Sequence, residues 1–205
     1  DISFEVEPGQ MVGIVGATGA GKSTLAQLIP RLFDPTEGTV SVGGKDHKTV
    51  SRGTLKKNIS IVLQKAILFS GTIAGNIKQG KADATDEEMT RAARIAQAAE
   101  FITTKDGQYD SEVEERGNNF SGGQKQRLAL ARTIITNPEI YIFDEATSNI
   151  DVESEESIWE AIYELSKDKT ILVISHRLAN VTEAKNIYVM NKGILVENGT
   201  HDELM

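Results

Sequence analysis

The stretch Met11-Val12-Gly13-Ile14-Val15-Gly16-Ala17-Thr18-Gly19-Ala20-Gly21-Lys22-Ser23 decides the fold of this chain. Residues 11–15 form an apolar run of strand length, and residues 16–23 have the glycine spacing of a P-loop. The run Lys22–Phe33 then predicts a helix. A strand, a glycine-rich loop and a helix in this order are the context that phosphate binding by such a loop requires. The stretch therefore predicts a nucleotide site.

The P-loop predicts a division of labour among its residues. Glycines allow backbone N–H groups to surround the α- and β-phosphates, while Lys22 reaches the β/γ oxygens and the Ser23 hydroxyl ligates Mg²⁺. Thr24 adds a further phosphate contact. The alternative is a chance glycine-rich turn, which eight matched positions between a strand and a helix disfavour. The predicted nucleotide contacts here are Gly16, Ala17, Thr18, Gly19, Ala20, Gly21, Lys22, Ser23 and Thr24.

Length and composition restrict the class of protein. The 205 residues suffice for one substantial core with a small appended subdomain. A net charge of −8 without a long Lys/Arg block argues against nucleic acid as the main partner. The absence of cysteine excludes disulfides and Cys-based metal sites. Apolar runs are of strand length, far short of the roughly 18 residues that cross a bilayer, so we expect the chain itself to be soluble.

Strands and helices alternate along the chain. Apolar runs predict strands at residues 59–63, 140–143 and 170–175, and residues 187–197 predict a hairpin. Between residues 71 and 132 the pattern is helical, with a capping box at Thr85–Glu88. This order predicts an α/β core with an inserted helical subdomain. At the beginning, Ile2, Phe4 and Val6 alternate with polar residues, which predicts a strand already under way and a domain cut from a longer chain.

A second glycine-rich turn, Phe120-Ser121-Gly122-Gly123-Gln124, opens a helix predicted to run through Thr136. Free N–H groups and the positive end of the helix make this turn a second phosphate cradle. One nucleotide does not need two cradles on one domain. We therefore expect a site shared between two copies of the domain.

Three further strand ends carry polar residues with chemical roles. Asp144-Glu145 follows the apolar strand 140–143, where phosphate-transfer folds place an Mg²⁺ carboxylate. Glu145 would then polarise the attacking water, although such a pair could also cap the next helix. His176 follows the strand 170–175 and could orient that water, although a lone His is more often structural. Gln64 ends the strand 59–63 and could sense Mg²⁺ or water.

These residues together resemble the nucleotide-binding domain of ATP-binding cassette (ABC) transporters. The motifs of that family occur in its order over the whole chain. They are the Walker A loop Gly16–Ser23, the Q-loop glutamine Gln64, the signature Phe120–Gln124, the Walker B strand Ile140–Asp144 followed by Glu145, the D-loop Ser148–Asp151 and the switch histidine His176.

The resemblance implies a P-loop NTPase (RecA-like) core sheet with an inserted helical subdomain and small β elements. It implies one nucleotide-binding domain over 1–205, with the core at 1–71 and 133–205 and the helical subdomain at 72–132. It also implies ATP and Mg²⁺ as cofactors. The implied catalytic residues are Glu145, His176, Lys22 and Gln64. The implied metal ligands are Ser23, Gln64 and Asp144. Further implied nucleotide contacts are Gln64, Phe120, Ser121, Gly122, Gly123, Gln124 and Asp151.

The same resemblance implies partners and a place in the cell. Two such domains would pack head to tail, each signature closing over the ATP on the other's P-loop. Phe69–Ile73 and Glu115–Gly117 look like the exporter type, in which membrane helices precede this domain in one polypeptide. The domain would then lie at the cytoplasmic face of the cell membrane, and the aromatic residue that stacks on adenine would precede Asp1.

Three positions depart from the family pattern. Phe120 stands in place of the usual Leu, Lys65 follows Gln64 where an acidic residue is common, and Asn149 replaces a small residue. These departures are similar to those of exporters built from two different halves, so the partner is expected to be either an identical or a different domain. The leading hypothesis is an ATPase motor for export. The alternatives are a soluble ABC ATPase not linked to transport, and a module that dimerises on ATP with little turnover.

Overall fold

A computed structural model describes residues 2–205, and Asp1, with which the predicted domain begins, lies outside them. The chain forms two compact units, which we describe separately. The first unit contains the residues up to Ile61, together with Pro138–Glu145 and Leu165–Met205. The second unit contains Val62–Asn137 and Ala146–Glu164.

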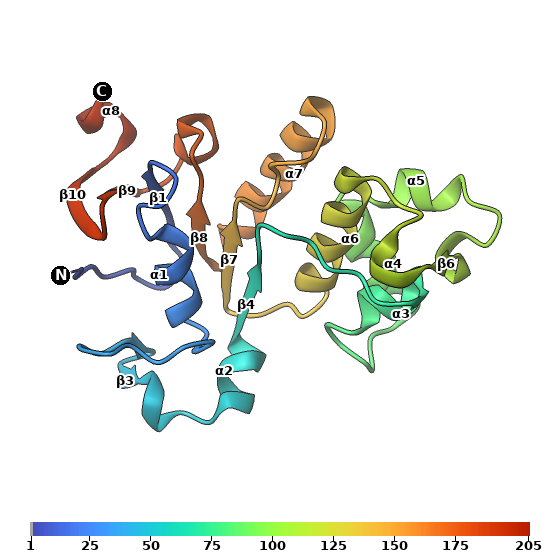
Figure 1. The fold of residues 1–205 in the computed structure, drawn as a ribbon, viewed down its shortest axis with the longest axis horizontal. Helices are drawn as coiled ribbons and strands as arrows, with labels where there is room; N and C mark the ends of the chain where they lie inside the picture. The colour runs from blue at the N-terminus through green and yellow to red at the C-terminus, as the bar shows by residue number, and fades with distance from the viewer. Residues whose placement is uncertain (1) are drawn as a thin grey trace. The chain divides into compact units, whose positions relative to one another are not determined.

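The first unit is built around a six-stranded sheet with the strand order β10-β9-β1-β8-β7-β4 (Figure 1). Strand β1 pairs in parallel with β8 and β9, and β7 pairs in parallel with β8, while β10 returns antiparallel to β9. The strands are β1 (Met11–Gly16), β4 (Ile59–Val62), β7 (Ile140–Asp144), β8 (Thr170–Ile174), β9 (Asn186–Asn191) and β10 (Ile194–Gly199).

Continuous apolar runs explain why the central strands pair in parallel. Strands β1, β7 and β8 are buried along almost their whole length, as strands are when a parallel sheet is covered on both faces. Ile14, Ile142 and Ile174 are at most 1% exposed and belong to the core cluster of this unit. The predicted strands and the predicted hairpin β9–β10 are therefore confirmed.

Helix α1 (Lys22–Leu28) follows the P-loop but is shorter than predicted. The prediction that it reaches Phe33 is wrong. Pro30 has no N–H group to continue the helix, and Arg31 takes a left-handed φ of 59°. The residues after the helix end, Leu32 and Phe33, are exposed.

The second unit is mainly helical. Its helices are α3 (Ile73–Lys78), α4 (Asp86–Ile95), α5 (Ala99–Thr103), α6 (Gly122–Ile134) and α7 (Val152–Leu165), the last ending one residue beyond it. Helix α4 begins with the predicted capping box, in which Thr85 and Glu88 bond to each other's backbone N–H groups. The helical pattern is interrupted at Gln97, whose left-handed φ of 53° separates α4 from α5.

The remaining elements are short. They are β2 (Ser41–Val42), β3 (Lys45–Asp46), η1 (His47–Thr49), α2 (Arg52–Asn58), β5 (Gly71–Thr72), η2 (Gln108–Asp110), β6 (Glu112–Val113), η3 (Glu115–Gly117), η4 (Leu178–Val181) and α8 (His201–Leu204). Strands β2 and β3 form a two-stranded antiparallel sheet, as do β5 and β6. Within residues 2–205, no helix combines the length and the apolar character that crossing a membrane requires.

The predicted strand at the beginning of the chain is absent from the described residues. Ile2, Phe4 and Val6 do alternate between partial burial and exposure with their neighbours, and all three pack on the core of the first unit. The ring of Phe4 lies 4.9 Å from that of Tyr188, whose hydroxyl donates to the Glu5 carbonyl at 2.9 Å. The alternation of apolar and polar residues at 2–7 therefore results from side-chain packing on the core and not from pairing in a sheet.

The prediction of an α/β fold with a P-loop core sheet is confirmed. A mainly parallel central sheet carries the strand–loop–helix unit at β1 and α1, and the Asp144-Glu145 pair lies at the end of β7. Since β1, β7 and β8 run in the same direction, their carboxyl ends meet at one edge of the sheet. Ligands of open parallel sheets bind at this edge.

Candidate functional site

The P-loop leaves β1 through a turn that only glycine can make. Gly16 has a φ of 151°, and a Cβ atom there would lie 2.2 Å from the Met190 carbonyl oxygen on β9. Gly19 and Gly21 also have positive φ, at 81° and 97°. The loop therefore follows a path that the glycines of the motif permit and that other residues would obstruct.

The Lys22 ammonium is held inside the P-loop. Its Nζ donates to the carbonyl oxygens of Gly16 at 2.9 Å and of Ala17 at 3.1 Å, and the residue is buried. Ala17, Thr18 and Gly19 are exposed at the top of the loop. A buried cation beside exposed amides gives the loop the charge that binds phosphate oxygens.

Ser23 and Asp144 meet at the end of the sheet. The Ser23 Oγ donates to Asp144 Oδ1 at 3.0 Å, although the two residues lie far apart in the sequence. Asp144 is only 1% exposed, and this burial raises the pKa of its carboxyl, an effect that the Ser23 hydrogen bond opposes. The two predicted metal ligands of the first unit are therefore in contact.

These two oxygen ligands fit a magnesium ion. Mg²⁺ prefers oxygen and is often bound by one or two carboxylates together with substrate phosphates and water. A cation beside Asp144 would offset the cost of burying its charge. Among the described residues, no group of three or more His, Cys, Asp or Glu side chains is arranged to hold a metal ion.

Glu145 and His176 lie together beyond the ends of β7 and β8. The register pairs Asp144 with Ile174, so the residues that follow each strand leave the sheet side by side. Glu145 Oε1 is 3.4 Å from His176 Nδ1. The Glu145 side chain is largely buried, whereas His176 is half exposed. The structure thus pairs the predicted base with the predicted switch histidine.

The backbone of Glu145 contains a feature that sequence reasoning missed. Its φ of 49° is left-handed, a conformation that costs a residue with a side chain about 1 kcal/mol. The Glu145 N–H donates to the Ile174 carbonyl at 3.0 Å and holds this turn in place. Unfavourable backbone geometry of this kind is frequent at functional sites.

A small network that the sequence did not reveal shapes the turn around His176. The Ser175 Oγ accepts the Arg177 N–H at 2.9 Å and lies 3.4 Å from Asn180 Nδ2. Ser175 and Asn180 are both buried, while His176 between them points outward. Polar residues after an apolar strand were the only sequence signal for this network.

The second cradle lies in the second unit, at the beginning of α6. Ser121 is the N-cap: its Oγ accepts the Gln124 N–H at 3.2 Å, and Gln124 Oε1 accepts the Ser121 N–H at 3.1 Å. Ser121 and Gly122 are exposed. The Ser121 hydroxyl and the amides of the first turn therefore stand at the positive end of a 13-residue helix.

Phe120 differs from the other residues of the signature because its side chain turns inward. It is 6% exposed, its ring lies 6.3 Å from that of Phe101, and the Lys105 ammonium lies 4.5 Å above it. The side chain thus supports the turn from within its own unit. This packing is consistent with a bulky aromatic residue at this position, and the expectation drawn from Phe120 about the partner domain stays a prediction.

Gln64 and Asp151 belong to the second unit, and we describe them within it. Gln64 is exposed just after β4. Asp151 precedes α7, and its Oδ1 accepts the Ser154 N–H at 2.9 Å, which lowers the pKa of this carboxyl. Asp151 therefore caps a helix, and its predicted nucleotide contact stays a prediction.

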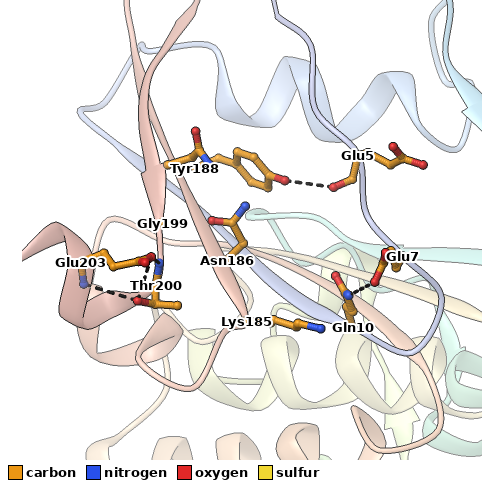
Figure 2. A pocket seen from close by; sticks show the side chains of 10 residues that line it. Glu5, Glu7, Gln10, Lys185, Asn186, Tyr188, Gly199, Thr200 and Glu203 are labelled. Atoms are coloured by element: carbon orange, nitrogen blue, oxygen red, sulfur yellow. Dashed lines mark hydrogen bonds between the residues drawn. The ribbon is translucent and has the colours of Figure 1, made fainter.

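One open polar cavity, of about 840 Å³, contains none of the predicted site residues. It lies in the first unit, between the beginning of the chain and strands β9 and β10 (Figure 2). Glu203 in its wall accepts the Thr200 N–H at 2.8 Å, and Gln10 is bonded to Glu7. These bonds occupy part of the polar lining of the cavity, and no predicted role falls on its residues.

Comparisons with known proteins agree with these features. Residues 1–148 match the family described as ABC transporter. A β-(1→2)-glucan export ATP-binding/permease protein of Brucella abortus is 49% identical over 204 residues, covering 100% of this chain and 34% of that protein. A putative multidrug export ATP-binding/permease protein of Staphylococcus aureus is 49% identical over 205 residues, which are 36% of its length. A bacterial Atm1-family ABC exporter with ATP bound superposes with a TM-score of 0.96 and 42% identity over 99% of this chain and 36% of its own. The chain thus spans about a third of the length of these relatives.

Proposed function

This chain belongs to the ABC transporter family, and from that premise we propose that it is the ATP-hydrolysing motor domain of a membrane exporter. The family and the exporter type predicted from the motifs are confirmed by the comparisons. Hydrolysis, its coupling to transport and the partners are the proposal.

One observation carries the proposal. At a single edge of the parallel sheet, the P-loop residue Ser23 bonds to Asp144, and the next residue, Glu145, lies 3.4 Å from His176. A phosphate cradle, a metal ligand and an acid–base pair are the groups that hydrolysis of a bound triphosphate requires. A module that only binds ATP would not need the last pair.

Each group has a defined part in this mechanism. Lys22 and the loop amides hold the phosphates in line, and Ser23 and Asp144 hold Mg²⁺, which neutralises charge on the phosphate oxygens when it is bound. Glu145 accepts a proton from the attacking water. His176, in contact with Glu145, orients that water and the γ-phosphate.

The second cradle needs a second copy of the domain. Ser121 and the first amides of α6 can bind the γ-phosphate of ATP held on the partner's P-loop, with the two domains head to tail. ATP then links the two domains, and loss of the γ-phosphate removes the link. An identical and a different partner domain both fit this arrangement.

We expect the membrane-spanning part to contact the segment after Gln64. Ile67 and Phe69 are about half exposed and stand close together in the sequence, so this segment offers apolar surface to a partner. Their segment is fixed by Arg132, which donates to the Ile67 carbonyl at 2.9 Å and lies 5.3 Å from the Phe69 ring. The relatives are ATP-binding/permease proteins, and this domain would work at the cytoplasmic face of a membrane.

Glu145→Gln tests the proposal. Removing the base should slow ATP hydrolysis by about 10²–10⁴-fold, and the uncleaved ATP should hold the domains together as dimers. Phosphate release and sedimentation velocity measure the two effects. The matched control is Glu197→Gln, at an exposed glutamate of β10 in the same unit, which should behave as the unchanged chain.

The outcomes separate the proposed motor from the alternatives. Unchanged hydrolysis in Glu145→Gln would remove Glu145 from its role. If the unchanged chain dimerises on ATP but hydrolyses none, the regulatory module is the better description. A full-length protein that hydrolyses ATP but has no membrane part would favour the soluble ABC ATPase.

A further inference from the structure

Arg127, on the second turn of α6, joins three separate segments of the second unit. Its Nη1 donates to the Gln97 carbonyl at 3.0 Å and to the Ser154 Oγ at 3.1 Å. Its Nη2 is 3.9 Å from Asp151 Oδ2, and its guanidinium carbon lies 5.2 Å from the centre of the Phe101 ring. One side chain thus links the signature helix to the α4–α5 junction and to the beginning of α7.

The Arg127 side chain is 13% exposed, so its bonds form largely away from water. Its Nε is buried and has no hydrogen-bond partner among the described residues, which leaves the Nη atoms and the Phe101 face to stabilise the charge. A planar fork suits this task, because it can bond to two segments while it stacks on a ring. Lysine offers one compact charge instead.

The loop 148–151 lies directly on the glycine turn of the signature. A Cβ atom on Gly123 would be 2.8 Å from the Asn149 carbonyl oxygen, and one on Gly122 would be 3.8 Å from the Asn149 Cβ. This close contact requires a fixed loop. Arg127 contacts Asp151, at the end of the loop, and Ser154, in the first turn of α7.

We propose that Arg127 is a positioning residue that holds loop 148–151 against the turn Ser121–Gly123, so that the two form one surface toward a second copy of this chain. The proposal rests on the proposed function for its second copy, and on the contacts above for the position of the loop. Arg127 itself touches no nucleotide in this scheme.

Hydrogen exchange and self-association of the chain carrying Glu145→Gln test the proposal. Arg127→Met should raise exchange of the amides in 148–155 at least 10-fold and weaken ATP-dependent dimers at least 10-fold. ATP affinity should stay within about twofold, because the P-loop lies in the first unit. Arg127→Lys should give a smaller effect, since it restores the charge but not the fork.

Two further variants make the test specific. Arg91→Met, at an exposed arginine of α4 in the same unit, is the matched control and should change none of these quantities. Ser154→Ala removes one acceptor of Arg127 without changing the charge, so it also serves if Arg127→Met does not fold. In the double variant, the effects of Ser154→Ala and Arg127→Lys on hydrogen exchange should be less than additive, because both changes act on one shared contact.

Unchanged exchange in 148–155 in both Arg127→Lys and Ser154→Ala would overturn the proposal. Faster exchange with dimers of unchanged strength would overturn the part that concerns the shared surface. If the parent chain forms no ATP-dependent dimer, the proposed function fails, and the exchange difference alone still decides whether Arg127 positions the loop.

Discussion

At the residue scale, the contact between Glu145 and His176 distinguishes a hydrolytic site from a simple phosphate cradle. The left-handed φ of Glu145 and the bonded Ser175 turn bring the two side chains within 3.4 Å. Their cost in backbone conformation is understandable if the pair acts on a bound ligand.

His176→Ala should lower the rate of ATP hydrolysis at saturating ATP by about 10²-fold, because a positioned acid–base partner contributes on that order. ATP affinity should change little, since the P-loop is intact. Phosphate release and equilibrium ATP binding measure the two effects. His201→Ala is the matched control, in α8 of the same unit, and equal rates for both variants would contradict the role of His176.

Asp144→Asn should stabilise the metal-free domain. Burial raises the pKa of Asp144 in the folded protein above its value in the unfolded chain. The folded protein therefore loses stability as the pH rises from the unfolded pKa through the folded one, because the buried carboxyl must then ionise. This loss persists at neutral pH. Asn is uncharged and can still accept from Ser23. At pH 7 the variant should melt about 2 °C higher or more.

Calorimetry in the presence of a chelator measures this difference, which should shrink as the pH falls toward 4. The same variant should lose the effect of Mg²⁺ on ATP binding. A lower melting temperature at pH 7, with Mg²⁺ dependence retained, would contradict both the burial argument and the assignment of Asp144 as metal ligand.

At the element scale, two capping boxes with the same geometry begin α4 and α6. Ser121→Ala and Thr85→Ala should each lower the free energy of unfolding by about 1 kcal/mol, because each removes one N-cap bond. Only Ser121→Ala should also weaken ATP-dependent dimers, by at least 10-fold.

Thr85→Ala is thus the matched control for loss of a cap. Denaturant unfolding gives the stability, and sedimentation velocity in the Glu145→Gln background gives the dimer strength. Equal dimer strength in the two variants would remove the Ser121 hydroxyl from the shared site and leave it a helix cap only.

At the scale of the whole molecule, ATP with Mg²⁺ should stabilise the chain by mass action. At 100 times the dissociation constant the gain is ~2.7 kcal/mol, or about 5–10 °C for a chain of this size. A chelator should reduce the shift, and Lys22→Ala should abolish it. Differential scanning calorimetry of the Glu145→Gln chain checks this, and a full shift in Lys22→Ala would place the nucleotide elsewhere.

The sequence by itself determined which elements form and which residues carry chemistry. The apolar run 11–15 and the P-loop predicted β1 and the start of α1. The capping box at Thr85 and the glycine-rich turn 120–124 predicted where α4 and α6 begin. These signals are local, since each depends on residues within one or two turns of the chain.

Only the tertiary structure decided what these residues meet. Four features depend on residues that are distant in the sequence. They are the bond from Ser23 to Asp144, the packing of Phe120 inside the helical unit, the absence of a strand at residues 2–6 and the contacts of Arg127 with separate segments. The physical reason is that hydrophobic periodicity reports which side of an element is buried, whereas strand register and packing select its neighbours.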